Sequence, residues 1–226
     1  MSDALDSFLD KWRSRWPEWQ LAEGFVPSGQ RATTLAWFAL LQELEDIMNV
    51  TGDPLPADAK LAWWQQELRD WSARRSRHPL GRGLEPFEAP WRQLAETLPA
   101  IQAAREVPAS LDAALAGLED FARAQAAVEA VLFQRTAPAA PRVLAVQWLA
   151  ARADAGSEAP PAGLDAQQWR AQLLRQWPAK PALARPHRIW SRLARLRLKR
   201  QQAGQPLPAP ALQLVWHSWR AASGGD

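Results

Sequence analysis

Apolar residues recur every three or four positions along most of the chain, and no stretch alternates with a period of two. This spacing predicts amphipathic helices rather than strands, so we expect an all-α fold. Ala, Leu, Arg, Glu and Gln, all good helix formers, dominate the segments between the Pro- and Gly-rich breaks. We predict helices over residues 3–21, 30–50, 57–75, 89–106, 111–133, 142–154, 165–176, 186–202 and 211–222.

The second of these helices has the clearest apolar stripe. We expect its inward side chains to be Leu35, Phe38, Leu41, Leu44 and Met48. The chain has 226 residues, and we expect residues 1–226 to form a single helical domain with one sizeable core.

Composition narrows the classes of function. There is no cysteine, which excludes disulfides, thiolate metal sites and cysteine nucleophiles. No apolar run approaches the roughly 18 residues of a membrane span. The first residues lack the apolar segment of a secretory signal, so we expect a cytoplasmic protein.

Charge is distributed unevenly along the chain. Residues 1–70 carry twelve acidic and six basic residues, whereas residues 167–226 carry eleven basic residues and one acidic residue. The formal net charge of +3 conceals this polarity.

An acidic cluster near the end of the second helix is the main candidate for chemistry. Glu45 and Asp46 lie four and three residues before Asn49, and Gln42 lies one turn earlier. At this spacing side chains project from one side of a helix. Two carboxylates and an amide oxygen could hold Mg²⁺, with a diphosphate completing the shell. The alternative is a solvated helix face with no function.

The segment around this cluster resembles the first substrate-binding helix of the squalene/phytoene synthase family. Without a gap, the chain places family-typical residues at Pro27, Arg31, Ala36, Ala39, Glu43, Asp46 and Ile47. A second match follows in Trp63-Trp64-x-x-Glu67-Leu68 and then His78-Pro79. We expect both tryptophans to pack in the core and His78 to be a loop residue at the end of a helix, ordered by Pro79.

The departures from the family pattern fall on the chemistry. Glu45 stands where the first aspartate of the metal box is expected, Asn49 where the last is expected, and Gln42 where an arginine is expected. The family's second acidic box corresponds to the segment around Arg152 and Asp154. No Asp-x-x-x-Asp occurs after Asp154.

The resemblance implies a shortened isoprenoid synthase bundle. Because the metal motifs are eroded, we expect a non-catalytic protein with a binding or assembly role. Such relatives exist in this family, including an assembly factor of mitochondrial respiratory complex I. The alternative is an active Mg²⁺-dependent transferase that condenses two prenyl diphosphates. In that case the resemblance assigns Mg²⁺ to Glu45, Asp46, Asn49 and Asp154, and the diphosphate to Arg31, Gln42 and Arg152.

A basic stripe on the helix over residues 186–202 supports a third hypothesis. Arg188, Arg192, Arg195 and Lys199 follow a helical spacing beside apolar positions. Such a helix could bind a lipid, the anionic inner face of a membrane or an acidic protein, as a peripheral membrane or assembly adaptor. The simpler interpretation is a packed helix with a solvated arginine face. We find no nucleic-acid reading motif and expect no nucleic-acid partner.

Overall fold

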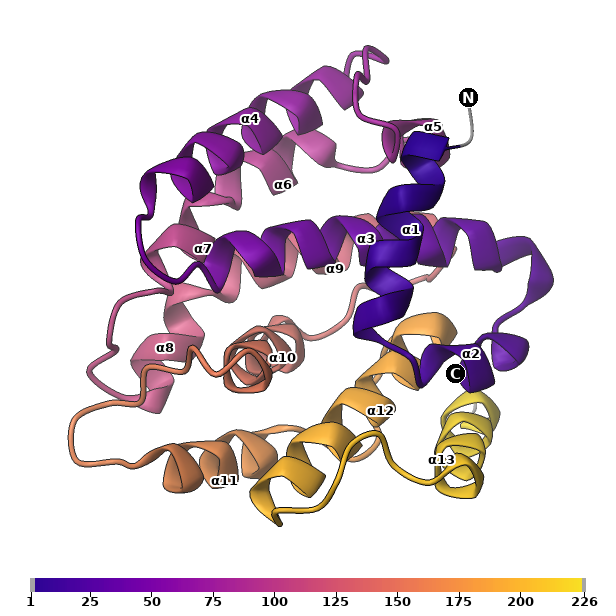
Figure 1. Ribbon diagram of the computed structural model, residues 1–226. Coiled ribbons are helices and arrows are strands. Elements are labelled where there is room, and N and C mark those ends of the chain that lie inside the picture. Colours follow the sequence, from indigo (N-terminus) through magenta and orange to yellow (C-terminus); the bar gives the residue numbers. More distant parts are fainter. Residues whose placement is uncertain (1–2, 225–226) are drawn as a thin grey trace.

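The computed structural model describes residues 3–224, and over that range the regular elements are helices alone (Figure 1). The all-α prediction is therefore confirmed. The α-helices are α1 (Asp3–Arg15), α2 (Trp19–Ala22), α3 (Arg31–Met48), α4 (Leu55–Trp71), α5 (Gly81–Leu84), α6 (Trp91–Thr97), α7 (Pro99–Ala103), α8 (Leu111–Gly117), α9 (Glu119–Leu132), α10 (Pro141–Asp154), α11 (Ala166–Gln176), α12 (Arg185–Gln202) and α13 (Ala211–Ser223). Two short 3₁₀ turns, η1 (Glu23–Phe25) and η2 (Ser28–Gln30), precede α3.

Helix α3 runs through the middle of the bundle, as Figure 1 shows. Fourteen of its 18 residues are buried, so it is a core helix rather than an amphipathic surface helix. Helix α1 crosses it, and α4, α5, α7 and α10 also contact it. On the far side of α10 lie α11 and α12, and α13 packs against α12 and α2.

Four predicted helices end early or divide in the structure, and proline explains two of these differences. The helix predicted to reach residue 75 ends at Trp71. The first ends at Arg15 rather than at residue 21, just before Pro17, which lacks an amide hydrogen and disfavours helical geometry in the residue before it. The segment 89–106 divides into α6 and α7, with Pro99 as the first residue of α7. The segment 111–133 divides after Gly117, a weak helix former.

The buried apolar residues form one continuous cluster. All five inward positions predicted for α3 are buried, as are the four apolar positions Ile189, Trp190, Leu193 and Leu196 on α12. Trp64 is 1% exposed, whereas Trp63 is 38% exposed, so only the second tryptophan of the pair is a core residue. None of the helices between residues 3 and 224 is long and apolar enough to cross a bilayer.

Candidate functional site

The acidic side chains of α3 diverge. Glu43 and Asp46 turn towards α1, where Lys11 Nζ lies 2.7 Å from Glu43 Oε1 and 2.6 Å from Asp46 Oδ2. A second amine, Lys60 Nζ on α4, lies 2.5 Å from Glu43 Oε2. Gln42 Nε2 donates to Asp46 Oδ1 at 2.8 Å. These carboxylates are therefore already paired with cations of the chain itself.

Glu45 lies on a different side of α3 from Glu43 and Asp46, because each step along a helix turns the side chain by about 100°. It lines a cavity of about 20 Å³ that Asp154 of α10 and Trp190 of α12 also line. A volume of this size holds about one water molecule. Burial raises the pKa of Glu45 to about 8, and the nearby charges of Arg15 and Arg197 offset only part of that effect. Glu45 is therefore mostly protonated at neutral pH.

The negative charge of Asp154 is neutralised by residues of α12. Arg197 Nη1 donates to its Oδ2 at 3.0 Å, and Gln201 Nε2 donates to its Oδ1 at 2.6 Å. Arg197 also pairs with Glu18 at 2.7 Å and lies 3.9 Å above the ring of Trp16. This arginine joins α12 to α10 and to the chain after α1.

The other predicted metal and diphosphate residues make local structural contacts. Asn49 Oδ1 accepts from Ser157 Oγ at 2.6 Å. Arg152 donates to the backbone oxygens of Ser157, at 2.7 Å, and of Ala104. Burial and then the charge of Arg105 lower the pKa of Arg152.

Arg31 donates to the carbonyl oxygens of Val26 at 3.1 Å and Gly24 at 3.3 Å, so it fixes the turn before α3. Arg152 lines a different cavity of about 190 Å³ together with Glu158. Of the predicted metal and diphosphate residues, the structure brings only Glu45 and Asp154 to one common cavity. Between residues 3 and 224, no three His, Asp or Glu side chains are grouped so that they could hold a metal.

The alternative interpretation of a solvated acidic face is wrong for two of the acids. Glu43 is 3% exposed and Glu45 is 9% exposed. The reason is that α3 is surrounded by other helices, so even its polar positions face protein.

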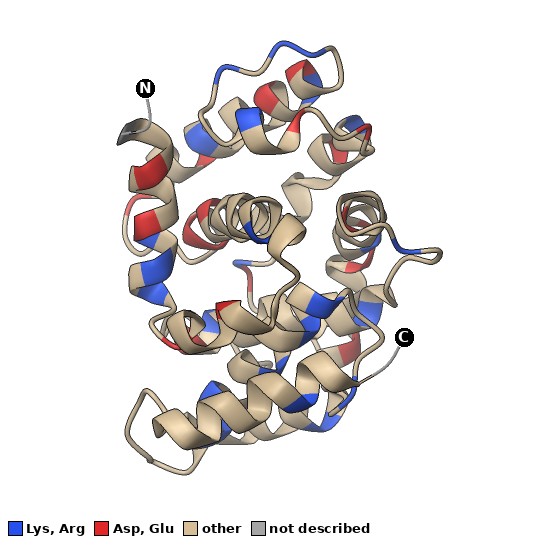
Figure 2. Cartoon of the chain, turned by 90° about the vertical axis from the view of Figure 1, so that its right-hand side faces the viewer, with Lys and Arg blue, Asp and Glu red and all other residues tan. Residues whose placement is uncertain are grey.

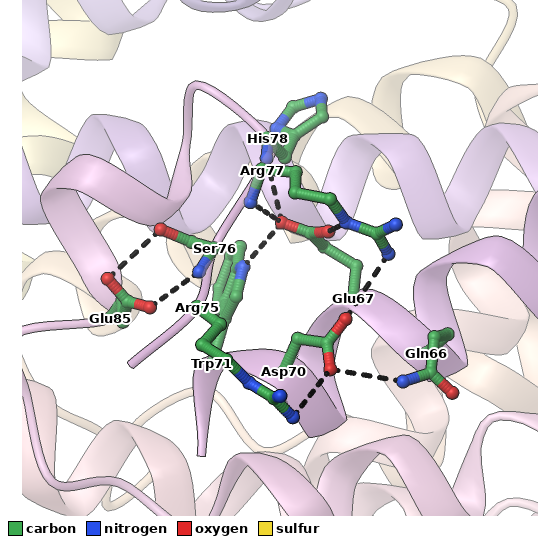
Figure 3. Close-up of polar contacts among 9 residues, drawn as sticks. All are labelled: Gln66, Glu67, Asp70, Trp71, Arg75, Ser76, Arg77, His78 and Glu85. Carbon is green, nitrogen blue, oxygen red and sulfur yellow. Dashed lines mark hydrogen bonds and ion pairs between the residues drawn. The ribbon is translucent and has the colours of Figure 1, made fainter. Parts of the chain in front are cut away.

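The Trp-Trp-x-x-Glu-Leu segment organises the loop after α4 (Figure 3). The Glu67 carboxylate is buried and accepts four hydrogen bonds. The donors are Trp71 Nε1 at 2.9 Å, the backbone amides of Arg77 and His78 at 2.7 Å each, and Arg77 Nε at 3.2 Å. Glu67 therefore holds the returning loop against the helix it came from.

His78 completes this arrangement by packing against aromatic rings. Its ring centroid lies 4.4 Å from that of Phe8 and 4.6 Å from that of Trp64. Its Nδ1 accepts from the backbone amide of Leu80 at 3.2 Å. Burial lowers the pKa of His78 to about 4, so the ring is neutral and structural at neutral pH.

A buried polar network, which the sequence pattern did not reveal to us, occupies the centre of the bundle. Glu129 of α9 accepts from Trp37 Nε1 at 3.0 Å and from Gln125 Nε2 at 2.8 Å, and it contacts His187 Nδ1 at 2.7 Å. His187 Nε2 in turn lies 2.7 Å from Gln147 Oε1. The available signal was the pair Gln125 and Glu129, which lie four residues apart among the apolar residues of α9.

The basic stripe of α12 is only partly solvated. Arg195 donates to the carbonyl oxygens of Trp177 at 3.0 Å and Leu174 at 3.4 Å. Arg192 donates to His217 Nδ1 at 2.9 Å. Arg188 donates to Ala221 O at 2.6 Å, and Lys199 is exposed.

Arg188 and Arg192 also line a groove of about 900 Å³. Four further basic residues that the sequence analysis did not single out share this groove: Arg135, Lys180, Arg185 and Arg220.

No family model, no curated protein and no solved structure matches this chain.

Proposed function

We propose that the chain is a non-catalytic relative of the squalene/phytoene synthases, a shortened isoprenoid synthase bundle with a binding or assembly role. The proposal combines the resemblance in residues 27–84 with the all-α architecture. The observation that carries it is the state of the acidic helix. Glu43 and Asp46 are paired with lysines of the chain itself, and Glu45 is buried with a pKa raised to about 8.

A prenyl transfer of this type needs Mg²⁺ ions that bridge carboxylates on two facing helices to a diphosphate. In this chain, a metal at Asp46 would compete with Lys11 at 2.6 Å, and a metal at Asp154 would compete with Arg197 at 3.0 Å. Glu45 would have to lose its proton before it could bind a metal, and burial raises the pKa of its carboxyl group to about 8. Each carboxylate is thus costly to recruit.

The space between the two acidic helices argues in the same direction. The cavity that Glu45 and Asp154 share, at about 20 Å³, has no room for a diphosphate or a prenyl chain. Trp16, Trp177 and Trp190 also line it. The Glu129–His187 network fills the neighbouring centre of the bundle.

The test is turnover of farnesyl or geranylgeranyl diphosphate in the presence of Mg²⁺, measured as released pyrophosphate. We expect no release above the background without protein. Asp46→Ala serves as the site variant, and Asp53→Ala, an exposed acid just after α3, serves as the matched control. Release that persists in Asp53→Ala and disappears in Asp46→Ala would overturn the proposal in favour of an active transferase with a reduced metal site.

A further inference from the structure

A groove of about 900 Å³ lies between the loop after α9, the loop before α12 and the end of α13. Its charged lining residues within the described part of the chain are all basic. We call it the basic groove and define it by Arg135, Lys180, Arg185, Arg188, Arg192 and Arg220. In Figure 2, Lys and Arg segments predominate near the label C, whereas most Asp and Glu segments lie in the upper and left-hand parts of the view.

Three cations of the basic groove, Lys180, Arg185 and Arg220, are available to an external anion. All three are exposed, and within residues 3–224 no carboxylate pairs with them. Helix α12 begins at Arg185, so the positive end of its dipole adds to the field there. Burial and then the charge of Arg220 lower the pKa of Arg192, a further sign that cations are crowded here.

Helix α13 carries an apolar stripe that the described residues, 3–224, leave exposed. The stripe consists of Leu212, Val215, Trp216 and Trp219, which follow the i, i+3, i+4, i+7 spacing of one helix face. Leu212 is 87% exposed, and Trp216 and Trp219 are each about half exposed. The opposite face of α13, with Leu214, Ser218 and Ala221, is buried against the protein.

The stripe and the groove adjoin each other. Arg220 lines the groove and lies four residues after Trp216, so the two side chains are neighbours on α13. The rings of Trp216 and Trp219 lie 5.1 Å apart, which makes them a continuous apolar surface. A strongly basic concavity is therefore bordered by exposed tryptophan and aliphatic side chains.

We propose that the basic groove and the α13 stripe together dock this protein on a bilayer containing anionic phospholipids. Arginine forms paired hydrogen bonds to phosphate groups, and basic clusters are attracted to anionic leaflets. Tryptophan favours the interface between headgroups and acyl chains, where its ring is buried and its N–H stays hydrated. Docking would cover the apolar surface that the folded chain leaves in water.

Other polyanions fit the surface less well. Binding of single-stranded nucleic acid would use aromatic faces to stack bases inside the basic channel. Here the exposed stripe lies beside the groove and includes Leu212 and Val215, which have no ring for stacking. A small phosphate compound would fill the groove but leave the stripe exposed. The docking proposal does not depend on whether the protein is catalytic.

Co-sedimentation with vesicles tests the proposal. We expect the protein to bind vesicles in which part of the phosphatidylcholine is replaced by phosphatidylglycerol, and to stay in solution with phosphatidylcholine alone. Each basic residue near an anionic surface strengthens binding roughly fivefold, so the triple variant Lys180→Gln/Arg185→Gln/Arg220→Gln should bind about a hundredfold more weakly. The double variant Trp216→Gln/Trp219→Gln should also lose binding, at unchanged charge.

The matched control is Arg69→Gln/Arg92→Gln/Arg123→Gln, which removes the same charge from exposed positions on α4, α6 and α9. It should bind like the native protein, and circular dichroism should show all variants folded. Equal losses in both triple variants, or equal binding to neutral vesicles, would overturn the proposal. So would a dimer in light scattering that the tryptophan variant abolishes, or pyrophosphate binding in the groove without vesicle binding.

Discussion

Glu43 and Glu45 lie two residues apart on α3, and both are buried, yet their surroundings differ in charge. Glu43 is held between Lys11 and Lys60. Glu45 faces a small cavity, and among residues 3–224 no side chain donates a hydrogen bond to its carboxylate. The same chemical change at the two positions should therefore have opposite effects.

We predict that Glu45→Gln stabilises the protein at neutral pH, whereas Glu43→Gln destabilises it. A carboxyl whose pKa rises from 4.5 to about 8 on folding must bind a proton, which weakens folding above pH 4.5. Replacing Glu45 should remove that cost, about 3 kcal/mol near pH 7. Replacing Glu43 should cost about 1 to 3 kcal/mol, because the buried carboxylate loses its charge-assisted hydrogen bond from Lys11 and its ion pair with Lys60.

The measurement is the free energy of unfolding in guanidinium chloride as a function of pH. In the native protein, the contribution of Glu45 is most favourable below pH 4.5 and declines as pH rises to about 8, where Glu45 ionises in the folded state. In Glu45→Gln this decline should be absent. A shift of the free energy of unfolding in the same direction in both variants would contradict the predicted difference between the two positions.

At the scale of elements, the loop over residues 72–80 depends on one carboxylate. Glu67 is fully buried and bonds the backbone amides of Arg77 and His78. Burial by itself would raise the pKa of Glu67, but these amides and the side chains of Trp71 and Arg77 together hold it below its usual value. The stabilisation is therefore present above pH 4.5 and is lost as pH falls through the lowered pKa.

We predict that Glu67→Ala destabilises the protein by about 3 kcal/mol and speeds hydrogen exchange at the amides of Arg77 and His78. The control is Asp70→Ala on the same helix, whose side chain is 16% exposed and which bonds no buried amide. It should cost less than about 1 kcal/mol and leave those amides protected. Equal protection loss in both variants would contradict a specific role for Glu67.

At the scale of the whole molecule, the network around Glu129 joins four helices, α3, α9, α10 and α12. Burial opposes ionisation of Glu129, but the charge and hydrogen bond of His187 keep its pKa below the usual value. Removing one member leaves a buried charge without its partner.

We predict that Glu129→Leu and His187→Leu each destabilise the bundle by about 3 to 5 kcal/mol, and that the double variant costs clearly less than the sum. Guanidinium unfolding of the four proteins gives the double-mutant cycle. Additive costs would show that the two residues act separately. Ala139→Gly, at a buried apolar site that is not a member of this hydrogen-bond network, controls for general loss of packing.

The helices were predictable because local spacing determines them. The prediction for α3, residues 30–50, differs from Arg31–Met48 by one residue at its start and two at its end. Two helices were predicted too long, over residues 3–21 and 89–106, although each segment contains a proline that signals a helix end or start. These prolines are Pro17 and Pro99. Burial of the five apolar positions on α3 also followed from their period.

The candidate site was less predictable, because its partners come from distant parts of the chain. The spacing of Glu45, Asp46 and Asn49 indicated that their side chains share one side of a helix. Such a set of oxygen ligands could bind Mg²⁺ if that side faced solvent. The neighbouring helices α1 and α12 supply Lys11 to Asp46 and Arg197 to Asp154, and these ion pairs come from segments far away in the sequence. The sequence contained these cations but gave no indication of their placement.

The sequence by itself determined an all-α chain, most helix limits, the apolar faces and the polarity between an acidic first third and a basic last quarter. These properties depend on neighbours within about one helical turn. The tertiary structure alone decided that Glu43 and Asp46 of α3 are paired with lysines, that Glu129 and His187 meet at the centre, and that basic residues from separate segments form one groove. Those outcomes depend on how helices cross, and no local pattern encodes the crossing.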